Sequence, residues 1–305
     1  MDRLPIAFGV DAPYLPHLAA TIASLAATAP RANFEFIVLH GGLPEGPKAM
    51  VEAAAPRARF RWVEIRDDML HGLDGHWHIS RATFYRLMLP EILEPEMKRL
   101  IYLDADLIVA RDIRQLWATD MENRAIAAVY DAGIDAVPFA RRWGLEPIPG
   151  SYFNAGVLLI DMERVRGEGV FRRAFEFLLA NRPELGFMDQ DALNHTLWRQ
   201  WRLLDPVWNV QRNMILGGMP NYVPDEMRLR GRPAIVHYTT EHKPWLPEVY
   251  HPYAWLYWRA LARTPFWADL AKAGGVNFGS QVRMGLRFLK RWPFLAPRDS
   301  GRLAA

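Results

Sequence analysis

Two hydrophobic periods alternate along the first half of the chain. Short apolar runs, typical of strands buried in a sheet, recur between longer stretches in which apolar residues return every three or four positions. Strands are predicted at 4–10, 34–39, 59–65, 100–103, 125–130 and 155–160, and helices at 15–27, 47–55 and 80–93, the last with Ser80 as its N-cap. This alternation predicts an α/β fold in which helices cover a mainly parallel sheet.

The predicted strand 100–103 ends at two aspartates one residue apart, Asp104 and Asp106. In extended backbone, residues i and i+2 point to the same side, so both carboxylates can meet one cation. Ligands of open α/β sheets bind beyond the carboxyl ends of the strands. Oxygen donors at that place suit Mg²⁺ or Mn²⁺ holding a phosphate-bearing substrate. The alternative is a solvated turn, where Asp is common for backbone reasons.

Composition narrows the class of protein. The 305 residues are 50% hydrophobic and 23% charged, which suits one large globular domain or two smaller ones. The absence of cysteine excludes disulfides and thiolate metal sites. A formal charge of +3 is too small to indicate nucleic-acid binding by itself.

The N-terminal region does not have the pattern of a cleaved signal peptide. Asp2 balances Arg3, and three early prolines interrupt the apolar stretch that such a signal requires. No run reaches the ~18 apolar residues of a spanning helix. We therefore expect a cytoplasmic protein, either soluble or peripheral on the inner face of the cell membrane.

Two polar clusters occur in the second half of the chain. Residues 235–237 begin as a strand that ends at His237, and the polar loop after it contains Lys243. An imidazole added to the two carboxylates would favour Mn²⁺ over Mg²⁺, and a lysine could neutralise a phosphate; a hydrogen-bonded histidine and a surface lysine are the alternative. The second cluster, 187–194, contains Asp189 and Asp191 directly before an apolar helical stretch, where helix capping competes with a functional role.

Together these residues resemble the retaining glycosyltransferases of family 8, which include α-galactosyltransferases and α-glucosyltransferases of lipopolysaccharide assembly. The resemblance runs from about residue 4 to about residue 245 and rests on six motifs in family order. They are Asp11 with Tyr14 and His17-Leu18; His78-Ile-Ser80 with Thr83 and Arg86; Tyr102-Leu-Asp104-Ala-Asp106; Tyr152-Phe-Asn154-Ala-Gly156-Val-Leu-Leu-Ile; Asp189-Gln190-Asp191 with Asn194; and His237-Tyr with Lys243-Pro-Trp245.

The resemblance implies a glycosyltransferase-A fold and a metal-dependent, retaining transfer of galactose or glucose from a UDP-sugar to a glycan or glycolipid acceptor. It implies Mn²⁺, with Mg²⁺ as the alternative, on Asp104, Asp106 and His237. The donor contacts that it implies are Asp11, Arg86, Asp104, Ala105, Asn154, Lys243 and Trp245. The catalytic residues that it implies are Gln190 beneath the anomeric carbon, Asp189 on a sugar hydroxyl, and Lys243 on the diphosphate.

One position departs from the family pattern. A polar pair commonly follows the first strand, whereas here Asp11 is followed by Ala12 and Pro13. Proline has no backbone donor, so a nucleoside contact must be lost or replaced there. Retention could proceed through a covalent glycosyl-enzyme or through attack on the same face. The amide of Gln190 is a poor nucleophile, which favours same-face attack.

The C-terminal region has a different character, and the chain is divided into a catalytic domain, 1–262, and a basic extension, 263–305. Within 280–292, the basic residues share one arc of a helix and apolar residues share the other. This pattern suits a helix lying on an anionic membrane. A helix packed on the domain with a solvated basic face remains the alternative.

Two other functions compete with this interpretation. A sugar-phosphate nucleotidylyltransferase would carry a glycine-rich loop after the first strand, and the loop 11–16 has no glycine. A catalytically silent carbohydrate-binding protein would not need the intact trio of Asp104, Asp106 and His237. The sequence leaves open which sugar is transferred, the acceptor and its linkage, and the oligomeric state.

Overall fold

The computed structural model describes residues 3–70, 80–216, 222–246, 249, 251–273, 283 and 286–287. A seven-stranded sheet has the order β3-β2-β1-β4-β7-β6-β8, and a three-stranded sheet has the order β5-β10-β9. The strands are β1 Leu4–Gly9, β2 Phe34–His40, β3 Arg59–Glu64, β4 Arg99–Leu103, β5 Leu107–Val109, β6 Ile126–Tyr130, β7 Phe153–Asp161, β8 Arg202–Leu203, β9 Val210–Gln211 and β10 Ile235–His237.

The large sheet is mainly parallel, which confirms the predicted fold class. Strand β1 pairs in parallel with β2 on one side and with β4 on the other. Strand β7 runs antiparallel to both of its neighbours, β4 and β6. Across the sheet, the strands that follow β1 in the chain, β2 and β3, lie on one side of it, and β4 and the later strands lie on the other. The direction of chain progress therefore switches between β1 and β4, and ligands bind in the crevice at such a switch point in this type of sheet.

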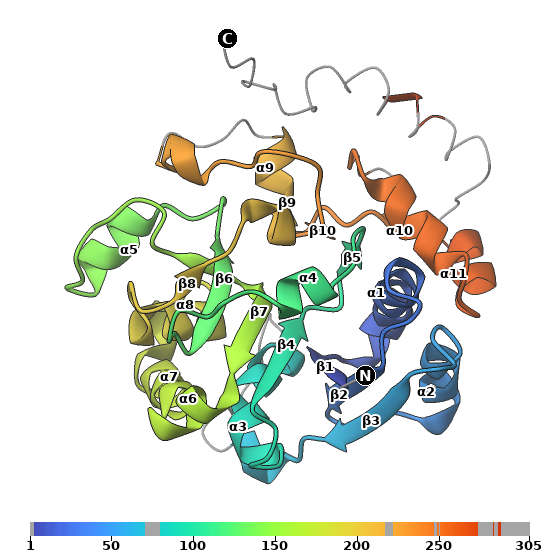
Figure 1. The fold of residues 1–305 in the computed structure, drawn as a ribbon, viewed down its shortest axis with the longest axis horizontal. Coiled ribbons are helices and arrows are strands. Elements are labelled where there is room, and N and C mark those ends of the chain that lie inside the picture. The colour runs from blue at the N-terminus through green and yellow to red at the C-terminus, as the bar shows by residue number, and fades with distance from the viewer. Residues whose placement is uncertain are drawn as a thin grey trace.

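Helices cover both faces of the large sheet (Figure 1). They are α1 Leu15–Thr28, α2 Glu45–Glu52, α3 Leu89–Ile92, α4 Arg114–Trp117, α5 Ala136–Arg142, α6 Met162–Gly167, α7 Val170–Asn181, α8 Met188–Thr196, α9 Arg212–Leu216, α10 Ala254–Leu261 and α11 Trp267–Ala273. Helices α1 and α10 lie together on one side, and α6, α7 and α8 gather on the other.

The core explains why the strand before the acidic pair reads as a continuous apolar run. Ile101 and Leu103 of β4 pack into one hydrophobic cluster, which also contains Leu18 and Ile22 of α1. Leu100 and Tyr102 point to the opposite face and pack into the second cluster. Because both faces of the sheet are covered, the strand cannot alternate apolar and polar residues. Its side chains are instead buried in both directions.

The predicted helix 80–93 has a different form in the structure. Ser80 is the N-cap as predicted, and its hydroxyl accepts a hydrogen bond from the backbone N–H of Ala82 at 3.2 Å. The chain then forms a 3-10 helix, Arg81–Met88, followed by the single turn α3. Pro90 cannot donate a backbone hydrogen bond, so it interrupts a regular α-helical ladder at this point. The tighter helix places Arg86 against the ends of β4 and β7.

The beginning of the C-terminal region packs on the rest of the fold. Phe266, just before α11, is buried, and the ring of Trp267 packs edge-on against Trp258 with centroids 6.1 Å apart. Of the segment 280–292 only Arg283, Leu286 and Arg287 are described, and all three are exposed; the rest of the predicted basic helix lies outside the described residues. None of the helices within the described ranges is long and apolar enough to cross a bilayer.

Candidate active site

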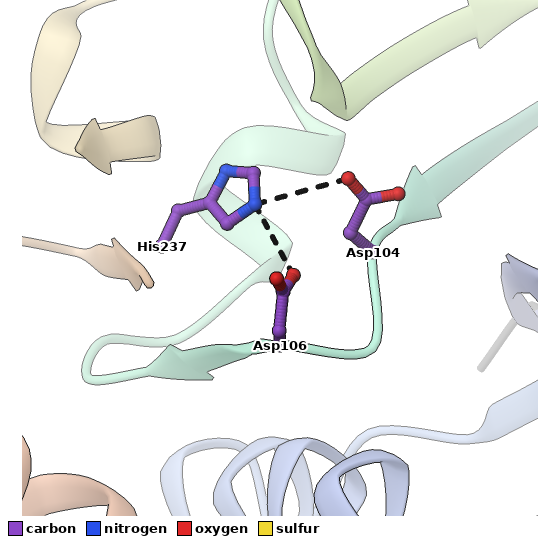
Figure 2. A group of neighbouring side chains, drawn as sticks. All are labelled: Asp104, Asp106 and His237. Carbon is purple, nitrogen blue, oxygen red and sulfur yellow. Dashed lines mark ion pairs between the residues drawn. The ribbon is translucent and has the colours of Figure 1, made fainter. Parts of the chain in front are cut away.

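The predicted metal trio converges at the switch point. Asp104 follows β4 directly, and Asp106 immediately precedes β5. Strand β10 pairs antiparallel with β5 and sets His237 opposite Leu107. Figure 2 shows the imidazole facing both carboxylates, with Nε2 of His237 3.8 Å from Oδ2 of Asp104 and 3.2 Å from Oδ1 of Asp106.

The trio fits a divalent cation. One ligand atom from each residue lies within 4.8 Å of the other two. Nδ1 of His237 lies 3.0 Å from Oδ1 of the buried Asn209. An Nδ1–H that donates to this oxygen leaves the lone pair of Nε2 for a metal, the arrangement in which a second partner sets the tautomer of a metal-binding histidine.

The space at the trio depends on a glycine of β7. A Cβ atom on Gly156 would lie 2.2 Å from Cε1 of His237 and 2.7 Å from Oδ2 of Asp104. Any side chain at this position would therefore displace two of the three candidate ligands. Gly156 was quoted in a sequence motif without a function, and Asn209 was missed altogether. The signal for Asn209 was a lone amide within the apolar segment 206–210.

A cavity of about 560 Å³ opens beside the acidic pair. Its volume lies in the usual range of small-molecule sites. Its lining includes six of the residues predicted from the sequence: Asp11, Arg86, Asp104, Ala105, Asp106 and Lys243. It is also lined by Gly9, Val10, Tyr14, Ser80, Ala82, Thr83, Tyr102, Thr240 and Glu241. His237, Asn154, Asp189, Gln190 and Trp245 are not among the lining residues.

Lys243 contacts one member of the acidic pair, Asp106, directly. Its Nζ lies 2.5 Å from Oδ2 of Asp106 and donates to the backbone oxygen of Tyr238 at 2.7 Å. Burial alone would raise the pKa of Asp106, but the ammonium of Lys243 and then the imidazole of His237 hold that pKa well below its usual range. Burial would likewise lower the pKa of Lys243, and the charge of Asp106 raises it instead.

Arg86 joins Asp104 to the predicted sugar-side residue Asp189. Its Nη2 donates to Oδ1 of Asp104 at 2.9 Å, and its Nε forms an ion pair with Oδ2 of Asp189 at 2.9 Å. The guanidinium also lies over the ring of Tyr102, 4.5 Å from the centroid. Burial raises the pKa of Asp189 to about 7, although the charge of Arg86 acts in the opposite direction.

The amides predicted to contact the sugar are held by hydrogen bonds. Oε1 of Gln190 accepts from the backbone N–H of Ala155 at 2.9 Å, and Nε2 donates to Oδ2 of Asp131 at 3.1 Å. Asn154 donates to the same Asp131 oxygen at 2.9 Å and accepts from the backbone N–H of Gly156 at 3.0 Å. Their amide orientations are therefore fixed before any ligand binds.

Two further candidates have mainly structural partners in this structure. Trp245 stacks on His17 with ring centroids 3.5 Å apart and packs edge-on against Tyr14, a residue of the cavity wall. Asp191, considered above as a helix-capping residue, accepts from the backbone N–H of Phe187 at 2.8 Å. A donor contact by Trp245 stays a prediction, whereas Asp191 contributes to the start of α8.

A mainly parallel sheet with an acidic pair at its switch point, beside a cavity of this size, agrees with the glycosyltransferase-A fold that the sequence motifs implied. A crystal structure of the galactosyltransferase LgtC in complex with donor and acceptor sugar analogues superposes with a TM-score of 0.79, covering 89% of this chain and all of the other at 23% identity. The chain belongs to glycosyltransferase family 8, because the model of that family matches residues 5–248.

Two curated relatives illustrate the range within this family. The chain is 30% identical to general stress protein A of Bacillus subtilis, over 83% of this chain and 91% of the relative. It is 26% identical to lipopolysaccharide 1,2-glucosyltransferase of Escherichia coli, over 88% and 80% respectively. The family and the fold stated from the sequence motifs are thus confirmed.

Proposed function

We propose that this protein is a retaining hexosyltransferase that moves galactose or glucose from a UDP-sugar to a glycan or glycolipid acceptor, in lipopolysaccharide or other cell-surface polysaccharide synthesis. The observation that carries the proposal is the convergence of Asp104, Asp106 and His237 at the edge of a cavity large enough for a nucleotide. The relative named as a lipopolysaccharide glucosyltransferase supports the acceptor class.

Mn²⁺ is the proposed metal, since an imidazole beside two carboxylates suits it better than Mg²⁺. A divalent cation on these residues would stabilise the negative charge of the departing diphosphate without a proton donor. Lys243, on the same side of the cavity, would add its charge to that stabilisation. Asp11 and Tyr14 would bind the nucleoside at the end of β1, with Pro13 removing one backbone donor.

The sugar would lie on the side of Asp104 where Arg86, Asp189, Asn154 and Gln190 gather. Buried carboxyl and amide groups there would bind its hydroxyls. We favour attack on the same face, because Gln190 is a poor nucleophile and Asp189 is held in an ion pair with Arg86. Trapping a sugar covalently on Asp189 or Gln190 in competent enzyme would overturn this part of the proposal.

The test is UDP release from UDP-galactose and UDP-glucose, with and without Mn²⁺. Asp104→Ala and Asp106→Ala should each abolish release while the far-UV spectrum stays native. Asp112→Asn is the matched control, because Asp112 lies in the same region but pairs with Arg114. Mn²⁺-dependent turnover that survives in both alanine variants would refute the metal assignment.

The division at residue 262 and the membrane role of 263–305 are part of the proposal. The extension would attach the enzyme to the inner face of the cell membrane, close to a lipid-linked acceptor. The exposed Arg283, Leu286 and Arg287 agree in character with that role.

A further inference from the structure

A line of four side chains connects Asp131, at the end of β6, to the candidate metal site. Nδ2 of Asn154 donates to Oδ2 of Asp131 at 2.9 Å, and Nδ2 of Asn209 donates to Oδ1 of Asn154 at 2.9 Å. Oδ1 of Asn209 then faces Nδ1 of His237 at 3.0 Å. Asn154, Asn209 and His237 are all buried, at 6%, 0% and 4% exposure, so water does not substitute for these partners.

The direction of every bond in this line follows from Asp131 and from the backbone N–H of Gly156, which donates to Oδ1 of Asn154 at 3.0 Å. A carboxylate can only accept hydrogen bonds, so Asp131 requires the NH₂ group of Asn154 on its side. The oxygen of Asn154 then faces Asn209, which must turn its own NH₂ group to that oxygen. The remaining oxygen of Asn209 faces His237, and only a protonated Nδ1 satisfies it.

We propose that Asp131 is a positioning residue of the metal site: through Asn154 and Asn209 it holds His237 in the tautomer that keeps the lone pair of Nε2 for the cation. This deepens the proposed function, since it rests on a metal at Asp104, Asp106 and His237. Asp131 itself does not contact the metal ligands; its effect passes through two amides.

Asparagine at position 131 cannot replace the carboxylate. Oδ1 of Asp131 accepts from the backbone N–H of Gly133 at 2.7 Å, while Oδ2 accepts from both Asn154 and Gln190. An asparagine has a single oxygen, so its NH₂ group would face a donor in either orientation. In one orientation this donor–donor contact falls on Asn154, which the backbone N–H of Gly156 holds from the other end. In the other orientation it falls on the backbone N–H of Gly133, outside the line.

The experiment is a double-mutant cycle on Mn²⁺ binding, read from the signal of free Mn²⁺ in paramagnetic resonance, with Mn²⁺ alone and again with UDP. Asp131→Asn should raise the Kd for Mn²⁺ about tenfold, the lower end of the effect of an outer-shell partner. Asn209→Asp places a carboxylate directly on Nδ1 of His237. In that background Asp131→Asn should change the Kd less than about threefold.

Asp135→Asn is the matched control for charge. Asp135 lies four residues away, and within the described part of the chain it accepts a hydrogen bond only from the backbone N–H of Val137. An asparagine serves equally well as this helix cap. Its substitution should leave the Kd within about twofold of the native value, since surface charges act weakly at a distance.

The outcomes separate this inference from the proposed function. Asp131→Asn could leave the Kd for Mn²⁺ unchanged, or raise it by the same factor with Asp at position 209 as with Asn. Either result would show that Asp131 does not act through the amides, and the metal assignment would stand without it. If the native protein binds no Mn²⁺ under either condition, both the inference and the metal assignment are overturned. Rescue by Asn209→Asp is the result that a merely structural role of Asp131 would not give.

Discussion

The ammonium of Lys243 lies 2.5 Å from Oδ2 of Asp106, so that a protein cation already neutralises one of the candidate metal ligands. The second partner of the ammonium, the backbone oxygen of Tyr238 at 2.7 Å, belongs to the residue that follows His237. A metal bound by Asp106 would therefore compete with Lys243 for the same carboxylate, and the diphosphate of the proposed donor would offer the displaced lysine an alternative partner.

This competition predicts that Lys243→Met tightens the binding of Mn²⁺ in the absence of nucleotide. A solvated ion pair contributes about 1 kcal/mol, and this pair is largely buried, so its loss should lower the Kd by at least about fivefold. Transfer should nevertheless slow, because the charge proposed to face the diphosphate is lost. Lys48→Met is the control, since Lys48 pairs with Glu45 on α2. Unchanged or weaker Mn²⁺ binding in Lys243→Met would contradict the competition.

Gly156→Ala should disable the metal site without removing a ligand. The new methyl group would lie 2.2 Å from Cε1 of His237, so the ring or β7 must move. We expect a destabilisation of about 1–3 kcal/mol and a loss of Mn²⁺ affinity of at least about tenfold, measured by thermal unfolding and Mn²⁺ titration. Gly46→Ala in α2 meets no atom within 4 Å and should be neutral or stabilising. Native Mn²⁺ affinity in Gly156→Ala would show that the trio is not the metal site.

The buried carboxyl of Asp189 predicts a pH-dependent stability. Its pKa rises from 3.8 to about 7 on folding, so the folded protein keeps a proton that the unfolded chain loses at lower pH. Stability attributable to this group is present below about pH 4 and is lost as the pH rises to about 7. An asparagine side chain does not titrate, and the thermal midpoint of Asp189→Asn should therefore rise relative to the native midpoint between these two pH values.

The comparison needs a variant that removes an exposed carboxylate outside the site. Asp205→Asn suits it, because Asp205 is exposed and caps the short 3-10 helix that begins at Pro206. The pH dependence that Asp189→Asn removes should persist in Asp205→Asn. A constant difference between Asp189→Asn and native protein from about pH 4 to about pH 7 would rule out the raised pKa.

Removal of the basic extension beyond Lys272 should abolish attachment to anionic vesicles. We expect the full-length chain to sediment with such vesicles at low salt, and a chain truncated after Lys272 to stay in solution. Because each basic residue contributes about 1 kcal/mol near an anionic surface, a double Arg283→Glu, Arg287→Glu variant should bind at least about tenfold more weakly. Equal sedimentation of the full-length and truncated chains would contradict the proposed membrane attachment.

The alternation of apolar and polar residues determined much of this protein by itself. It predicted the strands of the parallel half, the helix after β1, and the carboxylate pair at the end of β4, because these features depend on neighbours within a few residues. Ser80 was identified as a cap for the same reason. The motifs also pointed correctly to family 8.

The tertiary structure alone decided what these pieces do together. It brought Nε2 of His237, from a distant part of the chain, within 3.2 Å of Oδ1 of Asp106. It placed Asn209 beside Nδ1 of the imidazole, and it left no room for a side chain at Gly156. It also paired the ammonium of Lys243 with the carboxylate of Asp106 and stacked the ring of Trp245 on that of His17. Such contacts depend on sheet order and on the packing of distant strands, and periodicity along a chain carries no record of which distant strands become neighbours.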